Sequence, residues 1–242
     1  MQEVYLYQTV HILGGRSLHL TAHLAVLDRW SRELFGRPAG FRQQPLARQI
    51  EALAAQTAPA DCDLSQFVRI VVPASGDPAF RLESEGISLY RGYDLRSLMP
   101  DAATLQYDIP FPEAPTSARE AAAGLARQQA RLHGASVAVR CDGDGIVRTA
   151  DDAPLFAVRG KTAFVSPAEA CVERELGLRA VEAAGLELEE RPVMRGELPG
   201  FDELFYVDHR GVTALAHCDG HPCMAILAER VAQSLGGLFP KM

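Results

Sequence analysis

Two histidines and two cysteines lie within residues 217–223, near the C-terminus of the chain. Imidazole and thiolate groups are ligands that zinc prefers, so this segment could hold a metal ion. Structural zinc sites usually combine two such segments, and no C-x-x-C pair occurs elsewhere in the sequence. Asp219 and Gly220, at the centre of the segment, are typical of a tight hairpin turn. The sequence therefore favours a β-hairpin here, and we expect no metal.

A cysteine nucleophile is the second possibility for chemistry. Cys171 lies close to the start of a predicted helix, where the helix amides favour a thiolate. A histidine that is near in space could activate it, and a cofactor-independent enzyme could be centred on Cys171, His209 or His11. The alternative is that Cys171 is a small buried thiol without reactivity.

The composition narrows the classes of partner. Acidic residues outnumber lysine and arginine by 31 to 24, which gives a net charge of -7 with no basic face. Nucleic acid and anionic membranes are therefore poor partners. No apolar run approaches the ~20 residues that span a bilayer, and the N-terminus lacks a signal-peptide pattern. The five dispersed cysteines fit reduced thiols, so we expect a cytoplasmic protein.

Helical signals are clear in both halves of the chain. The spacing of apolar residues predicts a helix over 21–35 that stops at Gly36. Ser117 and Glu120 form a capping-box pattern, which predicts a helix that opens there and runs to Gly134.

Further elements follow from caps and from β-branched runs. Ser166, with proline at the next position and glutamate three residues on, predicts a helix over 167–184. Runs rich in β-branched and aromatic residues predict strands between the helices. Helices are also expected over 44–56 and 222–235, and strands over 4–13, 67–72, 136–141, 146–149, 154–158, 162–165, 186–193, 203–207 and 212–217.

A proline-rich segment divides the chain. Residues 109–117 contain three prolines and no apolar periodicity, so we interpret them as a connection between two domains. A smaller N-terminal α/β domain would cover residues 1–108, and a larger C-terminal α/β domain would cover residues 118–242. The order of elements predicts a mixed α/β (α+β) fold.

A series of segments then stands out by its order and spacing. It comprises GGRSLHLTAHLAVLDRWSRELFG (14–36), GLARQQARLHGASVAV (124–139), LFAV (155–158), FVSP (164–167), LELEERPV (186–193), DELFYV (202–207) and CDG (218–220). The series resembles class IV aminotransferases, enzymes of pyridoxal phosphate fold type IV. D-amino-acid and branched-chain aminotransferases and aminodeoxychorismate lyase are members. The resemblance implies two domains that enclose the cofactor, usually within a homodimer. Relative to that family, the N-terminal domain is truncated at its start.

The resemblance places the Schiff-base lysine of the family at Thr116. Threonine cannot form the imine with the cofactor aldehyde, nor can it shuttle a proton as the amine does. The chain has only two lysines, Lys161 and Lys241. Lys161 is expected at a solvent-facing hairpin turn, and Lys241 is the penultimate residue. Neither is expected to reach the cofactor.

The other cofactor contacts of the family also differ here. A glutamate that keeps the pyridine nitrogen protonated corresponds to Thr149. The phosphate is held in the family by an arginine of the first helix, by a G-I-T-R helix start and by a late hydroxyl-rich turn. The corresponding residues are Val26, then Cys171, Val172, Glu173 and Arg174, and finally Asp208. Two of these are acids that would repel phosphate.

We interpret the chain as an aminotransferase class IV-like protein that is a pseudoenzyme for transamination, with no pyridoxal phosphate expected. It would bind another small ligand or a protein partner in the remnant interdomain cleft, as a homodimer. The alternative is a pyridoxal phosphate-dependent aminotransferase or aminodeoxychorismate lyase relative with displaced site residues. The residues that could line the cleft are Tyr7, His11, Thr116, Thr149, Cys171, Arg174 and His209.

Overall fold

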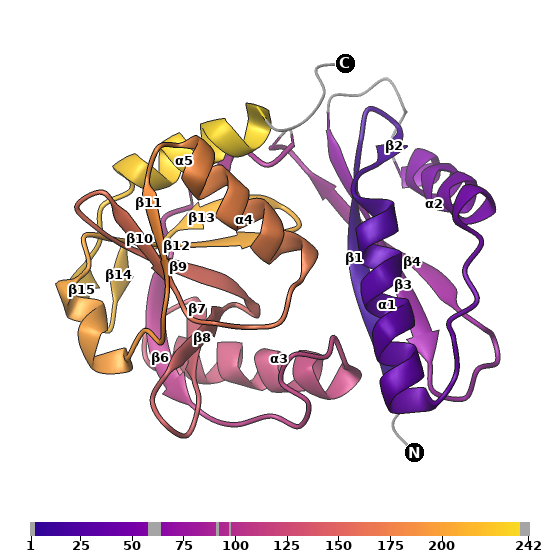
Figure 1. The fold of residues 1–242 in the computed structure, drawn as a ribbon, viewed down its shortest axis with the longest axis horizontal. Coiled ribbons are helices and arrows are strands. Elements are labelled where there is room, and N and C mark those ends of the chain that lie inside the picture. Colours follow the sequence, from indigo (N-terminus) through magenta and orange to yellow (C-terminus); the bar gives the residue numbers. More distant parts are fainter. Residues whose placement is uncertain (1–2, 58–63, 91, 97, 238–242) are drawn as a thin grey trace. The chain divides into compact units, whose positions relative to one another are not determined.

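The computed structural model describes residues 3–57, 64–90, 92–96 and 98–237 (Figure 1). The chain divides into two compact units. The first comprises Met1–Gly92 together with Pro110–Glu120, and the second comprises Tyr93–Ile109 together with Ala121–Met242. Within the described ranges, no helix is both long enough and apolar enough to cross a membrane.

The first unit is built on an antiparallel sheet with the strand order β2-β1-β3-β4. Helices α1 and α2 contribute to one hydrophobic core with this sheet. The strands are β1 (Tyr5–Leu13), β2 (Arg16–Ser17), β3 (Ser65–Pro73) and β4 (Arg81–Ser88), and the helices are α1 (Leu20–Phe35) and α2 (Gln43–Thr57).

Buried apolar side chains alternate with other residues along β1 and β3, and this alternation makes one face of the sheet apolar. Even-numbered residues such as Leu6, Val10 and Ile70 are fully buried and pack with Leu27 of α1 and Ile50 of α2. Because successive side chains of a strand point to opposite faces, the odd-numbered residues lie on the other face. Burying each large apolar side chain stabilises the unit by roughly 1.5–3 kcal/mol.

The second unit holds a larger mixed sheet with the order β15-β14-β6-β7-β8-β9-β12-β13-β5, and β10 and β11 extend it from β9. Strand β6 is parallel to both β7 and β14. The bounds are β5 (Leu95–Arg96), β6 (Asp101–Gln106), β7 (Val137–Cys141), β8 (Val147–Ala150), β9 (Ala153–Arg159), β10 (Thr162–Val165), β11 (Glu187–Glu190), β12 (Glu203–Asp208), β13 (Gly211–Ala214), β14 (His217–Cys218) and β15 (His221–Pro222).

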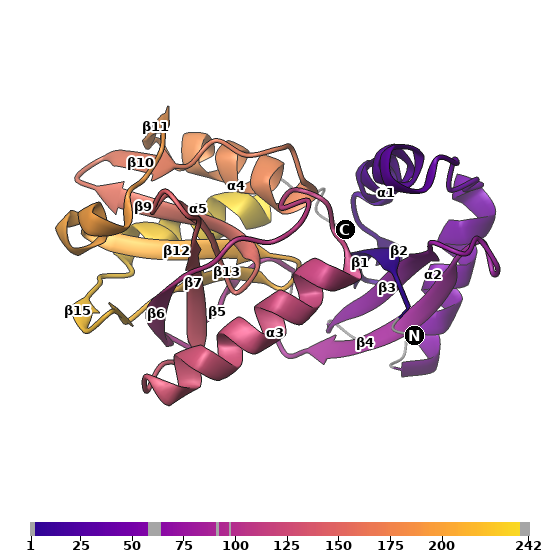
Figure 2. The same cartoon turned by 90° about the horizontal axis from the view of Figure 1, so that it is seen from below.

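Helices cover both sides of this sheet (Figure 2). Helix α3 (Ser117–Leu132) packs through small residues, with Ala126 and Ala130 against Ala103 and Ala138. Helices α4 (Val172–Ala183) and α5 (Ile226–Gly237) pack against each other and against β12 on the opposite side. A short 3-10 helix, η1 (Arg195–Gly200), precedes β12.

Many of the predicted elements are confirmed. The helices expected over 21–35 and 44–56 correspond to α1 and α2, and Gly36 ends α1 in the left-handed conformation. The hairpin expected at residues 217–223 is also present, because β14 and β15 pair antiparallel. Asp219 and Gly220 both have positive φ, as a two-residue hairpin turn of this kind requires.

One predicted helix start is wrong, and one predicted cap is shifted by a residue. Helix α4 begins at Val172 rather than at 167, because Ser166 is buried and serves the packing of the sheet instead of capping a helix. Its Oγ accepts a hydrogen bond from the Val193 amide at 3.1 Å. Helix α3 does begin at Ser117, but its cap is Thr116, one residue before the predicted capping box.

Candidate functional site

Thr116, where the resemblance places the Schiff-base lysine, is used by the fold as a helix cap. Its side chain is buried, and its Oγ1 accepts a hydrogen bond from the Arg119 amide at 3.2 Å. Its carbonyl accepts one from the Glu120 amide at 3.1 Å, which begins α3, and its backbone forms a bridge with Leu6 of β1. The cap satisfies an amide that has no partner within the helix.

Lys161 lies in the tight turn between β9 and β10 and is exposed, as predicted. Its carbonyl accepts a hydrogen bond from the Glu187 amide at 2.9 Å. Thr149 pairs with Pro154 at the other end of β9. Strand β9 runs five residues onward from Pro154 to Arg159, which is about 17 Å at roughly 3.3 Å per residue, and Lys161 lies in the turn beyond it. The lysine amine is therefore remote from Thr149 within this unit.

Two segments of the second unit lie near the buried ring of Tyr93, and a third lies near one of them. Burial raises the pKa of Tyr93, and the negative charges of Glu173, at the start of α4, and Asp208, at the end of β12, raise it further. Asp208 also raises the pKa of Asp151, which follows β8. The turn after Thr149, the start of α4 and the β12–β13 turn thus lie in one region. These are the segments in which the resemblance places contacts to the cofactor ring and phosphate.

Arg96 is the centre of a buried cluster in this region. It is 6% exposed, its Nε donates to Thr213 Oγ1 at 2.7 Å, and its Nη2 donates to the Tyr206 hydroxyl at 3.3 Å. The same Nη2 forms an ion pair with Asp208 Oδ2 at 3.1 Å and also contacts Thr213 Oγ1. The donors of this guanidinium are therefore directed at oxygens of the protein itself.

The carboxyl groups beside Arg96 are held in an environment that disfavours their charge. Burial raises the pKa of Asp208, while Arg96 and the amides of Arg210 and Gly211 act in the opposite direction. Burial likewise raises the pKa of Asp151, and Arg127, at 3.2 Å from its Oδ1, acts against that rise. Desolvation disfavours an ionised carboxylate unless a cation is close by. This region would bind a further anion only at a cost.

Gly211 fixes the turn that presents Asp208. Its φ is +127°, a conformation that residues with a Cβ avoid, and a Cβ would lie 2.5 Å from the Asp94 carbonyl oxygen. Asp208 closes the same turn, because its Oδ1 accepts a hydrogen bond from the Arg210 amide at 2.8 Å. His209 lies half-buried in this turn.

The start of α4 keeps one arginine of the family pattern but uses it structurally. Arg174 is buried, donates to the Ser166 carbonyl at 3.0 Å and forms an ion pair with Glu190. Cys171 is the N-cap residue and makes no side-chain cap hydrogen bond. Val172 is buried as well. The arginine is thus directed away from the role of a phosphate ligand.

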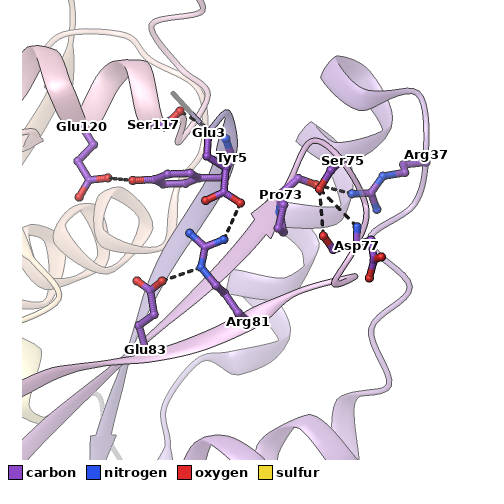
Figure 3. A network of polar contacts seen from close by, with 10 residues as sticks. All are labelled: Glu3, Tyr5, Arg37, Pro73, Ser75, Asp77, Arg81, Glu83, Ser117 and Glu120. Atoms are coloured by element: carbon purple, nitrogen blue, oxygen red, sulfur yellow. Dashed lines mark hydrogen bonds and ion pairs between the residues drawn. The ribbon is translucent and has the colours of Figure 1, made fainter. Parts of the chain in front are cut away.

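In the first unit, the odd-numbered face of the sheet carries aromatic and charged residues. The Arg69 guanidinium lies 4.2 Å from the ring centre of Tyr7 and 5.8 Å from that of Tyr5. The Tyr5 hydroxyl donates to Glu120 Oε2 at 2.7 Å (Figure 3). The same carboxylate pairs with Arg69. Tyr7 is therefore one wall of an arginine–aromatic stack.

Two other predicted residues of the first unit lie in its interior. His11 is fully buried, and its Nε2 lies 2.7 Å from Ser65 Oγ. That hydroxyl also accepts a hydrogen bond from the Gly92 amide at 2.9 Å. Val26 is half-buried against the core shared with α1 and α2.

No group of three histidine, cysteine or acidic side chains in the described ranges is arranged to hold a metal ion. What the second unit offers at the predicted contacts is three carboxylates, a thiol and two arginines whose charge is already paired. Such a set can accept hydrogen bonds from neutral or cationic ligand groups. Its buried arginines, Arg96 and Arg174, already pair with carboxylates, so a phosphate dianion would compete with those acids.

The comparisons with known proteins identify the class. The family model described as Amino-transferase class IV matches residues 5–208. The chain therefore belongs to the class IV aminotransferase family, and its mixed α+β fold is that of pyridoxal phosphate fold type IV. No curated protein sequence matches the chain.

The fold is similar to those of several solved aminotransferases. The branched-chain amino acid aminotransferase from Escherichia coli has a TM-score of 0.76 at 16% identity, over 98% of this chain and 85% of that one. A hypothetical aminotransferase from Mycobacterium tuberculosis, with α-ketoglutarate and PMP bound, has a TM-score of 0.75 at 16% identity, over 96% and 88%. The branched-chain aminotransferase from Thermoproteus uzoniensis has a TM-score of 0.74 at 18% identity, over 97% and 86%.

Sequence reasoning missed the Arg96 cluster. Arg96 lies in a two-residue strand, and its partners Tyr206, Asp208 and Thr213 are more than a hundred residues further along the chain. No local spacing connects them. Only the parallel pairing of β5 with β13 brings them together.

Proposed function

We propose that this member of the class IV aminotransferase family does not use pyridoxal phosphate and instead binds another small molecule or a protein partner. The observation that carries the proposal is the position of Lys161, the one lysine within the described ranges. It lies on an exposed turn beyond Arg159, the end of β9 that is about 17 Å along the strand from Pro154. Catalysis with this cofactor requires a lysine amine that bonds the cofactor aldehyde and then moves the proton. Thr116 supplies no such amine.

The remaining residues do not fit the cofactor either. A phosphate group near Glu173 and Asp208 would meet charge of its own sign, which disfavours binding. Arg96 and Arg174 are the buried cations of this region, and both already pair with carboxylates, while Arg210 of the β12–β13 turn is exposed. Freeing Arg96 would leave the largely buried Asp208 uncompensated, at a cost of several kcal/mol.

The ligand that these groups favour is neutral or positively charged. Asp151, Glu173 and Asp208 are acceptors, and a ligand amine or hydroxyl could donate to them. We further propose, from the family resemblance, that the protein is a homodimer, which light scattering of the purified chain would test.

A second candidate function is retained because the family match runs over residues 5–208. It is a pyridoxal phosphate-dependent aminotransferase or aminodeoxychorismate lyase activity in which a displaced lysine takes the catalytic role. The cofactor would then be held covalently, which gives this candidate a spectroscopic signature that the first lacks.

A titration with pyridoxal phosphate separates the two candidates. Absorbance and thermal unfolding of the purified protein are followed together, because a ligand at 100 times its Kd stabilises the folded state by about 2.7 kcal/mol. Under the proposal, neither a new absorbance band nor a shift in melting temperature develops. Lys161→Ala is the matched control, and it should behave as the wild type does.

The contrary result is equally definite. A saturable absorbance band that borohydride reduction converts into a stable covalent adduct would establish the second candidate, provided that the band is absent in Lys161→Ala. An adduct that persists in Lys161→Ala would point to Lys241.

A further inference from the structure

A pocket in the second unit lies apart from the Arg96 cluster and includes residues of the β14–β15 hairpin. Its volume is about 520 Å³, within the range of small-molecule sites. It lies between the start of β6, the loop after α3 and the β14–β15 hairpin, with Arg195 of η1 at one side. The polar residues that line it are Asp101, Thr104, His133, Arg195, His217 and Asp219.

The walls of the pocket are small where they meet the backbone. Ala102 and Ala103 of β6, Gly134 and Ala135 after α3, and Gly220 of the hairpin all line it. A ligand can therefore approach the main chain closely. The carbonyls at the end of α3 do not project unpaired into this space, since the Ala130 and Arg131 carbonyls accept hydrogen bonds from the amides of the loop.

Both acids of the pocket already have donors. The Asp219 carboxylate accepts hydrogen bonds from the amide of Thr104 at 2.8 Å and from its hydroxyl at 2.5 Å. Thr104 is itself buried, so this is a fixed interaction. Asp101 Oδ1 lies 2.7 Å from Nδ1 of His217 across the parallel β6–β14 pair. The negative charges are thus partly neutralised within the pocket.

The basic groups of the pocket, in contrast to its acids, have few partners within the protein. Within the described part of the chain, the one ion pair of the Arg195 guanidinium is with Asp219 at 4.0 Å, and its side chain is half-exposed. No side-chain partner of His133 is found there, nor any of the second ring nitrogen of His217. The pocket therefore has satisfied acceptors and unused donors.

We infer that this pocket is an oxyanion site, which takes a small molecule through a phosphate or carboxylate group. The planar fork of Arg195 matches either group, because it can give two parallel hydrogen bonds to one oxyanion. His133 and His217 line the same pocket as further hydrogen-bonding groups. The hairpin of residues 217–223, which could have bound a metal, serves instead to place His217 and Asp219 in the pocket walls. This inference does not depend on whether the protein binds pyridoxal phosphate.

Calorimetric titration with inorganic phosphate and, separately, with malonate tests the site and distinguishes its two ligand classes. The wild-type chain should bind at least one of them saturably, with one site per chain. Arg195→Gln should weaken that binding at least tenfold, because a charge-assisted pair is lost. Arg179→Gln is the matched control, since Arg179 is an exposed arginine of α4 outside the pocket.

Asp101→Asn reports the sign of the charge that binds. For an oxyanion, removing this negative charge should leave the affinity unchanged or increase it. Loss of affinity in Asp101→Asn together with retention in Arg195→Gln would overturn the inference in favour of a cation. Absence of saturable binding by both probes to the wild type, or equal weakening by Arg195→Gln and Arg179→Gln, would also overturn it. Unchanged melting temperatures of the variants exclude unfolding as the cause.

Discussion

Arg96 and Arg195 belong to the same unit but stand in opposite circumstances. Arg96 is buried, and its donors reach Thr213, Tyr206 and Asp208. Arg195 is half-exposed and has one ion pair at 4.0 Å. A buried guanidinium whose donors reach three protein side chains stabilises the fold and has little to offer a ligand. A guanidinium with one loose partner contributes little to the fold and remains available.

The comparison teaches that the partners of a charge, more than its presence, decide whether it marks a binding site. The family contacts retain arginines in the second unit, and a count of charges would suggest a phosphate site there. Arg96 and Arg174 are both committed to carboxylates. The pocket beside α3 has fewer arginines, yet the one that it has is free to act.

The largest expected effect comes from replacing the two arginines in parallel. Arg96→Leu should lower the free energy of unfolding by about 3–5 kcal/mol, because it leaves Asp208 buried without its cation. Arg195→Leu should change it by less than about 1 kcal/mol, as is usual for a half-exposed pair. Urea denaturation of both variants measures the difference.

A double-mutant cycle checks the cause. Asp208→Asn in the Arg96→Leu background should recover part of the loss, since the unpaired buried charge is gone. If the two substitutions were simply additive, the ion pair would not be the source of the stability, and the contrast between the two arginines would fail.

Thr116 resembles Arg96 in that its side-chain polar atom already forms a hydrogen bond within the protein. Thr116→Ala should destabilise the protein by about 1 kcal/mol, the usual cost of an N-cap side chain. Thr116→Ser keeps the hydroxyl and should retain most of that stability. The melting temperatures of the two variants provide the measurement, and equal losses would show that the hydroxyl does not cap α3.

Asp151 tests whether the region around Arg96 disfavours negative charge. Its pKa in the folded state is raised above the ordinary 3.8 by burial, and Asp208 contributes to the rise. At pH values between the ordinary pKa of the unfolded state and the raised pKa of the folded state, the folded state binds more protons than the unfolded state. This group therefore makes the wild type less stable as the pH rises. Asp151→Asn lacks that proton. Its stability relative to the wild type should therefore increase as the pH rises from about 4 towards neutrality.

The same measurement in Asp144→Asn is the control, since Asp144 is an exposed acid of the β7–β8 turn. A relative stability of Asp151→Asn that falls with rising pH would mean that Arg127 outweighs the burial of Asp151.

The smallest perturbation is a chemical one, alkylation of the cysteines. Burial raises the pKa of Cys141 to about 11 and that of Cys218 to about 12, so both should react slowly in the folded protein. Cys171 is half-buried at a helix N-terminus and should react first among these three. Mass spectrometry after timed iodoacetamide exposure gives the order. Rapid labelling of Cys218 would show that the pocket side of the sheet opens readily. Cys62 lies outside the described residues.

The fold could be predicted where local signals and packing agree. Apolar spacing and Gly36 are enough to define α1, and Asp219 with Gly220 is enough to define the β14–β15 hairpin. Ser166 shows the limit of such signals. Its serine–proline pattern suits a helix start, but the buried hydroxyl binds the Val193 amide, and that preference arises from tertiary packing.

The site could be predicted only as a set of positions. The family resemblance implies that Thr149, Glu173 and Asp208 correspond to cofactor contacts, and this stays a prediction. The electrostatic coupling of Glu173 and Asp208 to Tyr93, and of Asp208 to Asp151, says only that these segments lie near one another. Whether an arginine is fully paired, as Arg96 is, or only weakly paired, as Arg195 is, depends on partners that are distant in the chain. No spacing rule reports them.

The most direct test of the central claim is borohydride reduction in the presence of pyridoxal phosphate, followed by peptide mapping of the modified lysine. We expect at most partial, unsaturable labelling of Lys161, because its amine is exposed but does not hold the cofactor. Stoichiometric labelling of a single lysine, saturable and competed by free phosphate, would contradict it and would restore the cofactor chemistry of the family to this chain.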